Sequence, residues 1–263
     1  MFEEPRLKIK RANHHIDDFN TLFQNLVGQD GLYRLFSEEN PAGVFRLVAR
    51  VGQLIPEEAP LILGDAIHNL RSALDLMACD IVRAFNETPD RHTKFPFRDS
   101  EQKLIAALNG GKIKAAGSGV VDLIAKVIQP YPGGNGVALY ALHDADIDDK
   151  HLLIRPVIGE FKLTGVTASS PQGAFYNQHT FIITGEGQLG TQRASAPYEV
   201  HNQGQASFSI FFDKGNPFSG NPIVPTLHQL SQLVSGVVDS VEKKILDCWR
   251  RPKTEPLMRA VPI

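Results

Sequence analysis

The feature that most constrains the fold is the order of helical and strand-like patterns along the chain. Helical patterns dominate residues 1–151, strand-like patterns fill residues 152–222, and one long apolar stripe predicts a helix over residues 226–249. Segregated helices and antiparallel strands indicate an α+β fold, because a doubly wound α/β fold needs elements that alternate. We therefore expect a single α+β domain over residues 1–263, in which the last helix closes onto the earlier ones.

Apolar spacing and turn residues predict the individual elements. An apolar stripe predicts a helix over residues 7–27, and two β-prone runs within residues 31–51 predict an N-terminal hairpin. A second stripe predicts a helix from about residue 57 to residue 85. Shorter helices are expected near residues 99–108, 119–129 and 136–150, and strands of a C-terminal antiparallel sheet near residues 161–169, 179–186 and 205–214.

Composition and charge exclude several classes of protein. Apolar residues make up 42% of the chain and charged residues 21%, which is typical of a globular protein. The net charge of −2 gives no bulk attraction to nucleic acid or anionic lipid, so such binding would need a local patch. No apolar run approaches the roughly 18 residues of a membrane span, and the N-terminus lacks the apolar segment of a secretory signal. We expect a cytoplasmic protein.

Cysteine usage and glycine spacing argue against familiar cofactor sites. Cys79 and Cys248 lie far apart in helical patterns, which favours reduced thiols, and the chain has no CxxC pair for zinc. The glycine-rich segment 109–119 lacks the spacing of phosphate-binding loops, so we interpret it as a flexible surface loop. The sequence predicts no cofactor and assigns no metal ligand.

Ionisable side chains are concentrated on the helix predicted at residues 61–85. Asp65, His68 and Asp75 lie on a stripe almost opposite the apolar one, and Arg71 lies between the two stripes. Arg71 can pair with Asp75 at i,i+4, and Asp65 with His68 at i,i+3. Three interpretations stay open: a buried or interfacial polar network, a solvated surface, and a catalytic or ligand site.

A second concentration of charge occurs in LHDADIDDKH, residues 142–151. His143 and Asp146 are spaced at i,i+3, as are Asp148 and His151, and metal-binding pairs can use that spacing. A solvated acidic helix end is the competing interpretation. If the two segments meet in space, Asp149, Lys150 and His151 would face the polar residues of the earlier helix. The candidate site residues are therefore Asp65, His68, Arg71, Asp75, Asp149, Lys150 and His151.

Several of these motifs carry a resemblance. GDAIHNLRSALD (64–75), FPF (95–97), IQPY (128–131) and LHDADIDDKHLL (142–153) resemble those of a group of bacterial proteins of unknown function. More distantly, RSALD is similar to the Arg-x4-6-His motif of the HEPN helical superfamily. Many HEPN proteins are ribonucleases in which the arginine and histidine act on RNA at a dimer interface. The arginine corresponds to Arg71, but Leu76 occupies the place of the histidine.

The resemblance implies a non-catalytic or degenerate HEPN-like protein that acts in interaction or in RNA or nucleotide binding, as a homodimer. Without an imidazole at Leu76, acid–base work on RNA would lack its proton carrier. The alternative is a hydrolase of small molecules or phosphodiesters that uses the Asp/His/Arg cluster, with or without a divalent metal. A purely structural role for the polar network is the third hypothesis.

Overall fold

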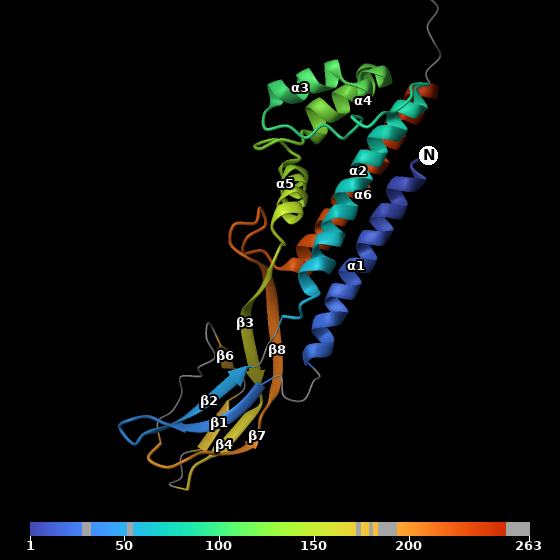
Figure 1. The fold of residues 1–263 in the computed structure, drawn as a ribbon. Helices are drawn as coiled ribbons and strands as arrows, with labels where there is room; N and C mark the ends of the chain where they lie inside the picture. The colour runs from blue at the N-terminus through green and yellow to red at the C-terminus, as the bar shows by residue number, and fades with distance from the viewer. Residues whose placement is uncertain (28–32, 52–54, 172–174, 179–180, 184–193, 251–263) are drawn as a thin grey trace, which may run out of the picture. The chain divides into compact units, whose positions relative to one another are not determined.

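The computed structural model describes residues 1–27, 33–51, 55–171, 175–178, 181–183 and 194–250 (Figure 1). The fold is α+β, as the sequence predicts, and includes the N-terminal hairpin. The helices are α1 (Glu3–Val27), α2 (Ala59–Ala84), α3 (Glu101–Gly110), η1 (Lys112–Ala116), α4 (Gly117–Asp122), η2 (Leu123–Ile128), α5 (Val137–His151) and α6 (Ile223–Arg250). Within these described helices, none is long and apolar enough to cross a membrane.

The strands form one hairpin and two three-stranded sheets, and all recorded pairs are antiparallel. The hairpin joins β1 (Tyr33–Glu39) to β2 (Phe45–Val51). One sheet has the order β6-β3-β8 and the other the order β5-β4-β7. Their bounds are β3 (Pro156–Thr164), β4 (Val166–Ser169), β5 (Phe175–Gln178), β6 (Phe181–Ile183), β7 (Glu199–Asn202) and β8 (Gln205–Phe212).

The predicted C-terminal sheet is therefore divided in two. Gly165 alone separates β3 from β4 and has a φ of +77°, a left-handed conformation that glycine adopts without the strain of a Cβ atom. The chain turns at this residue, so β3 and β4 pair with different strands. The alternating pattern of residues 161–169 looks continuous in sequence and hides the break.

The interpretation of residues 109–119 as a flexible loop is wrong. The segment contains the end of α3, the 3-10 helix η1 and the start of α4. Ile113 and Ala116 are buried, and these two side chains anchor the turn despite its glycines. The segment is thus held in place rather than free.

Backbone contacts divide the chain into two compact units. Unit 1 comprises Met1–Arg11, Asn69–His143 and Leu230–Ile263, and unit 2 comprises Ala12–His68 and Asp144–Gln229. The boundary passes through α1, α2, α5 and α6, so each of these helices contributes to both units.

Buried apolar side chains fix how α2 and the strands pack. The predicted apolar line of α2 is fully buried: Leu63, Ile67, Leu70, Leu74, Met77 and Ile81. In unit 2, the hairpin and the sheets share a cluster that includes Leu47, Phe161, Leu163 and Val166. In unit 1, burial of the α2 line fixes the rotation of the helix and therefore the direction in which Arg71 points.

Candidate functional site

Arg71 is the centre of a polar network in unit 1. Its side chain is 8% exposed, and it comes from the middle of α2. Nε donates a hydrogen bond to His143 Nδ1 at 3.1 Å, and Nη1 lies 2.7 Å from Asp75 Oδ1. The guanidinium carbon lies 4.4 Å from the centre of the Phe97 ring. The structure thus confirms the predicted Arg71–Asp75 pair and adds two partners.

These partners hold each other in place. Asp75 also accepts a hydrogen bond from the backbone N–H of Phe95 at 2.8 Å, which ties the segment after α2 to the helix. The Phe97 ring stacks on His143, with centres 4.7 Å apart, and packs edge-on against Phe95. Because His143 Nδ1 accepts from Arg71, a neutral His143 ring carries its hydrogen on Nε2. Arg71 is therefore held in one orientation.

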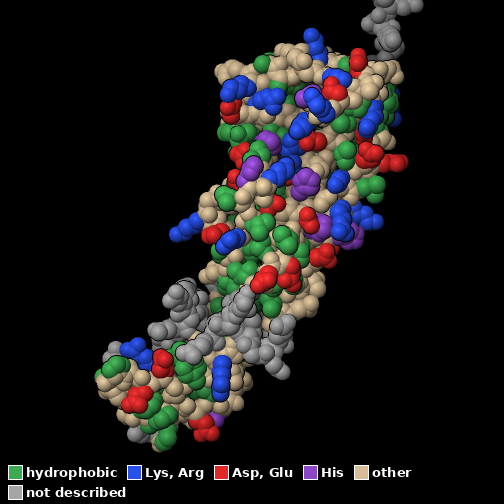
Figure 2. All heavy atoms as spheres, viewed as in Figure 1, with side chains coloured by type: hydrophobic (Ala, Val, Ile, Leu, Met, Phe, Trp, Pro, Cys, Tyr) green, Lys and Arg blue, Asp and Glu red, His purple; other side chains and the backbone are tan. Residues whose placement is uncertain are grey.

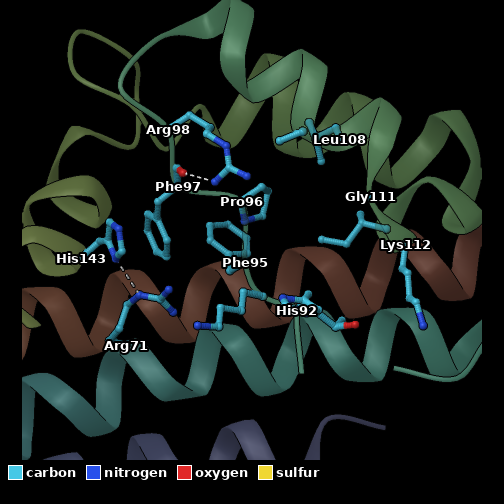
Figure 3. A pocket seen from close by; sticks show the side chains of 14 residues that line it. Arg71, His92, Phe95, Pro96, Phe97, Arg98, Leu108, Gly111, Lys112 and His143 are labelled. Carbon is cyan, nitrogen blue, oxygen red and sulfur yellow. Dashed lines mark hydrogen bonds between the residues drawn. The ribbon is translucent and has the colours of Figure 1, made fainter. Parts of the chain in front are cut away.

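The network borders a cavity of about 230 Å³ (Figure 3). Arg71 reaches it from α2, Arg98 from the segment before α3, and Lys112 from η1. The described residues that line it include no aspartate or glutamate: Arg71, His92, Thr93, Lys94, Phe95, Pro96, Phe97, Arg98, Ala107, Leu108, Gly111, Lys112, Ile113 and His143. On the face of the molecule that Figure 2 shows, acidic and basic side chains are mixed.

The lining has four permanent cations, and two of them pair with acidic residues that do not themselves line the cavity. Asp75 pairs with Arg71, and Asp90 lies 3.0 Å from Lys112 Nζ. The hydrogen bond from Lys112 is the main cause that lowers the pKa of Asp90 to about 2. Within the described residues, Lys94 and Arg98 form no ion pair. The cavity therefore keeps an uncompensated positive charge.

Arg71 also has unused hydrogen-bonding capacity. Nη1 is buried and, although it lies close to Asp75, the geometry makes no hydrogen bond with any acceptor among the described residues. A buried N–H without an acceptor is costly, and such a group in a native structure calls for an explanation. The nearby Asp75 carboxylate compensates the charge of this group.

A second polar group lies in unit 2, where α2 meets α5. His68 Nδ1 lies 2.8 Å from Asp146 Oδ1, and Lys150 Nζ lies 2.5 Å from Asp146 Oδ2. Burial of the Asp146 carboxyl opposes its ionisation, but the hydrogen bonds from Lys150 and His68 outweigh burial and lower the pKa of Asp146. The His68 side chain is half-exposed. This group explains why α2 and α5 both carry charge here.

Asp149 and Asp65 lie close to this second group. Burial raises the pKa of Asp149, the charges of Asp146 and Asp65 raise it further, and the Ile154 N–H and His68 act against them. Gly64 allows the close approach, because a Cβ there would overlap the carboxyl group of Asp149. In the described part of the chain, no group of three or more His, Cys, Asp or Glu residues is placed to hold a metal ion.

The predicted site residues therefore separate into two groups. Arg71 lines the cavity and Asp75 supports it, whereas Asp65, His68, Asp149, Lys150 and His151 do not line it. Lys94, Arg98 and Lys112 also line the cavity, although none of them was predicted from the sequence as a site residue. The segment KFPFR, residues 94–98, could have indicated two of them, because Lys94 and Arg98 flank the FPF motif. The sequence places His143 and Asp146 at a spacing that metal-binding pairs can use; in the structure His143 accepts a hydrogen bond from Arg71, and Asp146 contacts His68 and Lys150.

Leu76 stands where the HEPN motif has a histidine, yet Arg71 still contacts an imidazole. The motif in the sequence places no histidine on α2 after Arg71, but α5 supplies His143 from 72 residues further along the chain. Arg71 and His143 both line the cavity. No protein-family model, curated protein or solved structure matches the chain.

Proposed function

We propose that the protein is a non-catalytic, HEPN-like RNA- or nucleotide-binding protein whose Arg71 cavity holds a phosphate group. The observation that carries the proposal is a buried arginine, held in one direction, in a cavity whose described lining includes Lys94 and Arg98 and no acid. A planar guanidinium with fixed direction suits phosphate oxygens, because it donates parallel hydrogen bonds to them. A neutral ligand would leave the charge of Lys94 and Arg98 without a partner.

The support for phosphate, rather than a base, comes from the aromatic residues. Phe95 is 2% exposed and Phe97 is 4% exposed, and their rings are already packed on each other, on His143 and on Arg71. Proteins that bind single-stranded nucleic acid through bases offer exposed aromatic faces for stacking. Phosphate contacts carry no sequence information directly. We therefore expect binding with little dependence on RNA sequence.

We also propose a cytoplasmic location and a homodimeric state. Cys79 and Cys248 are free, half-buried thiols, which supports a reducing cytoplasmic environment. The HEPN resemblance supports a homodimer. Both are proposals that rest on the sequence and on these side chains.

The test of the proposal is fluorescence anisotropy with a short labelled RNA at about 50 mM salt, where phosphate contacts are strong. Arg98→Gln removes an uncompensated cation of the cavity, and we expect it to weaken binding by about tenfold. Lys126→Gln is the matched control, because Lys126 is exposed in unit 1, pairs with Asp122 and does not line the cavity. Binding that is absent, or that both variants weaken equally, would refute the proposal.

The alternative function, hydrolysis of a phosphodiester, is favoured by one observation. The imidazole of His143 lies beside Arg71 in the cavity, so a proton carrier and a charged phosphate-binding group occur together. The test is incubation of RNA with the wild type and with His143→Asn, each with and without EDTA. Cleavage that His143→Asn abolishes supports hydrolysis, and cleavage that EDTA abolishes supports its metal-dependent form. Intact RNA in every sample supports binding alone.

A further inference from the structure

We infer that the Arg71 cavity selects a terminal phosphomonoester, the dianionic phosphate on a mononucleotide or at the end of an RNA chain, over an internal phosphodiester. The inference rests on the proposed function, because it assumes that the cavity holds a phosphate of RNA or of a nucleotide. It goes further by naming the chemical form of that phosphate.

The charge of the cavity matches a dianion. Lys94 and Arg98 are the two lining cations without an acidic partner in the described chain, whereas Asp75 and Asp90 neutralise the other two. A phosphomonoester carries about −1.5 to −2 at pH 7, because its second pKa is about 6. An internal phosphodiester carries a single negative charge and would leave one cation uncompensated. The monoester therefore gains more from this lining.

The size of the cavity favours the same ligand. Its volume of about 230 Å³ is below the roughly 300 Å³ at which pockets for drug-sized ligands begin. A terminal phosphate enters such a cavity with one sugar outside it. An internal phosphate has a sugar on each side, so both neighbours would have to fit at the opening.

Arg71 supplies a cation of fixed direction. Its Nε donates to His143, its Nη1 lies 2.7 Å from Asp75 Oδ1, and the residue lines the cavity. A phosphate in the cavity therefore meets a cation whose orientation is already set. His143 acts here as a positioning residue, since it fixes the guanidinium.

The experiment is isothermal titration calorimetry with adenosine 5′-monophosphate, its 5′-methyl phosphate ester and inorganic phosphate. The ester has the same base and sugar and one negative charge fewer. We expect the monophosphate to bind at least about tenfold more tightly than the ester. Lys94→Gln and Arg98→Gln should each reduce this ratio towards one, whereas Lys126→Gln should keep it. RNA of one sequence with a 5′-phosphate or a 5′-hydroxyl end should repeat the preference.

The outcomes separate the inference from the function on which it rests. Equal binding of the monophosphate and its ester, both weakened by Arg98→Gln, would overturn the inference and leave phosphate binding in the cavity intact. Inorganic phosphate that binds as tightly as the monophosphate would overturn the assignment to nucleotides. No binding of any probe or RNA would refute the proposed function itself.

Discussion

At the scale of single residues, Arg71 links stability to binding. It is a buried charge that is oriented by an acid, an imidazole and an aromatic ring from three parts of unit 1. A buried arginine is costly to desolvate, and its partners recover that cost only with good geometry. Asp75 and His143 recover part of this cost for Arg71. Because Arg71 also lines the cavity, we interpret its fixed positive charge as the basis of ligand binding.

Arg71→Lys tests the structural part of this account. Lysine keeps the charge but loses the planar fork that contacts both Asp75 and His143. We expect the free energy of unfolding to fall by about 1–2 kcal/mol, measured by urea denaturation. Arg83→Lys is the control, because Arg83 is half-exposed and pairs with Asp80, and it should change stability by less than about 0.5 kcal/mol. Equal effects of the two variants would contradict the account.

Asp149→Asn should stabilise the protein at neutral pH. The pKa of Asp149 is raised in the folded state, so its ionised form at pH 7 is less favourable there than in the unfolded chain. Because the side chain is only half-buried, solvent screens this effect, and we expect a gain of about 0.5 kcal/mol. The gain should vanish below the unfolded pKa of about 3.9, where the carboxyl is protonated in both states. Thermal melts at several pH values measure it, with exposed Asp17→Asn as control; a loss of stability at pH 7 would contradict the prediction.

At the scale of elements, local sequence pattern predicts the long helices and the hairpin. The apolar line of α2 and the alternating runs of β1 and β2 report burial directly, so these elements could be found without the structure. The cavity could not be predicted. The contact between Arg71 and His143 joins residues 72 positions apart, and it depends on how α5 packs beside α2. The break at Gly165 was hidden because glycine also occurs within strands.

Gly165→Ala tests the break between β3 and β4. A Cβ at Gly165 would meet no atom within 4 Å, so the cost should arise from the positive φ alone. We expect a loss of about 1–2 kcal/mol in urea denaturation. Gly236→Ala makes the same substitution inside α6, where a Cβ also meets no neighbour, and should stabilise by up to about 1 kcal/mol. Losses of equal size at both positions would show that Gly165 is not a conformational requirement.

At the scale of the whole molecule, the oligomeric state tests the HEPN-like part of the proposal. Many HEPN proteins act at a dimer interface, so the HEPN-like proposal, which rests on the RSALD resemblance (71–75), predicts a homodimer. Sedimentation equilibrium should give twice the chain mass of 29.0 kDa. A monomer at micromolar concentration would contradict the HEPN-like part of the proposal. The proposed phosphate site would then be supported only by the geometry of the cavity.

The central claim is that a phosphate group enters the Arg71 cavity, and the side-chain resonance of Arg71 Nε–H tests it most directly. This N–H is buried and bonded to His143, which should protect it from exchange and make it visible in a proton–nitrogen correlation spectrum. The Arg71→Lys variant lacks this N–H, so the resonance that disappears from its spectrum is assigned to Arg71 Nε–H. We predict that adenosine 5′-monophosphate shifts this resonance saturably, with the dissociation constant found by calorimetry. Nucleotide binding that leaves the resonance unmoved would contradict the account.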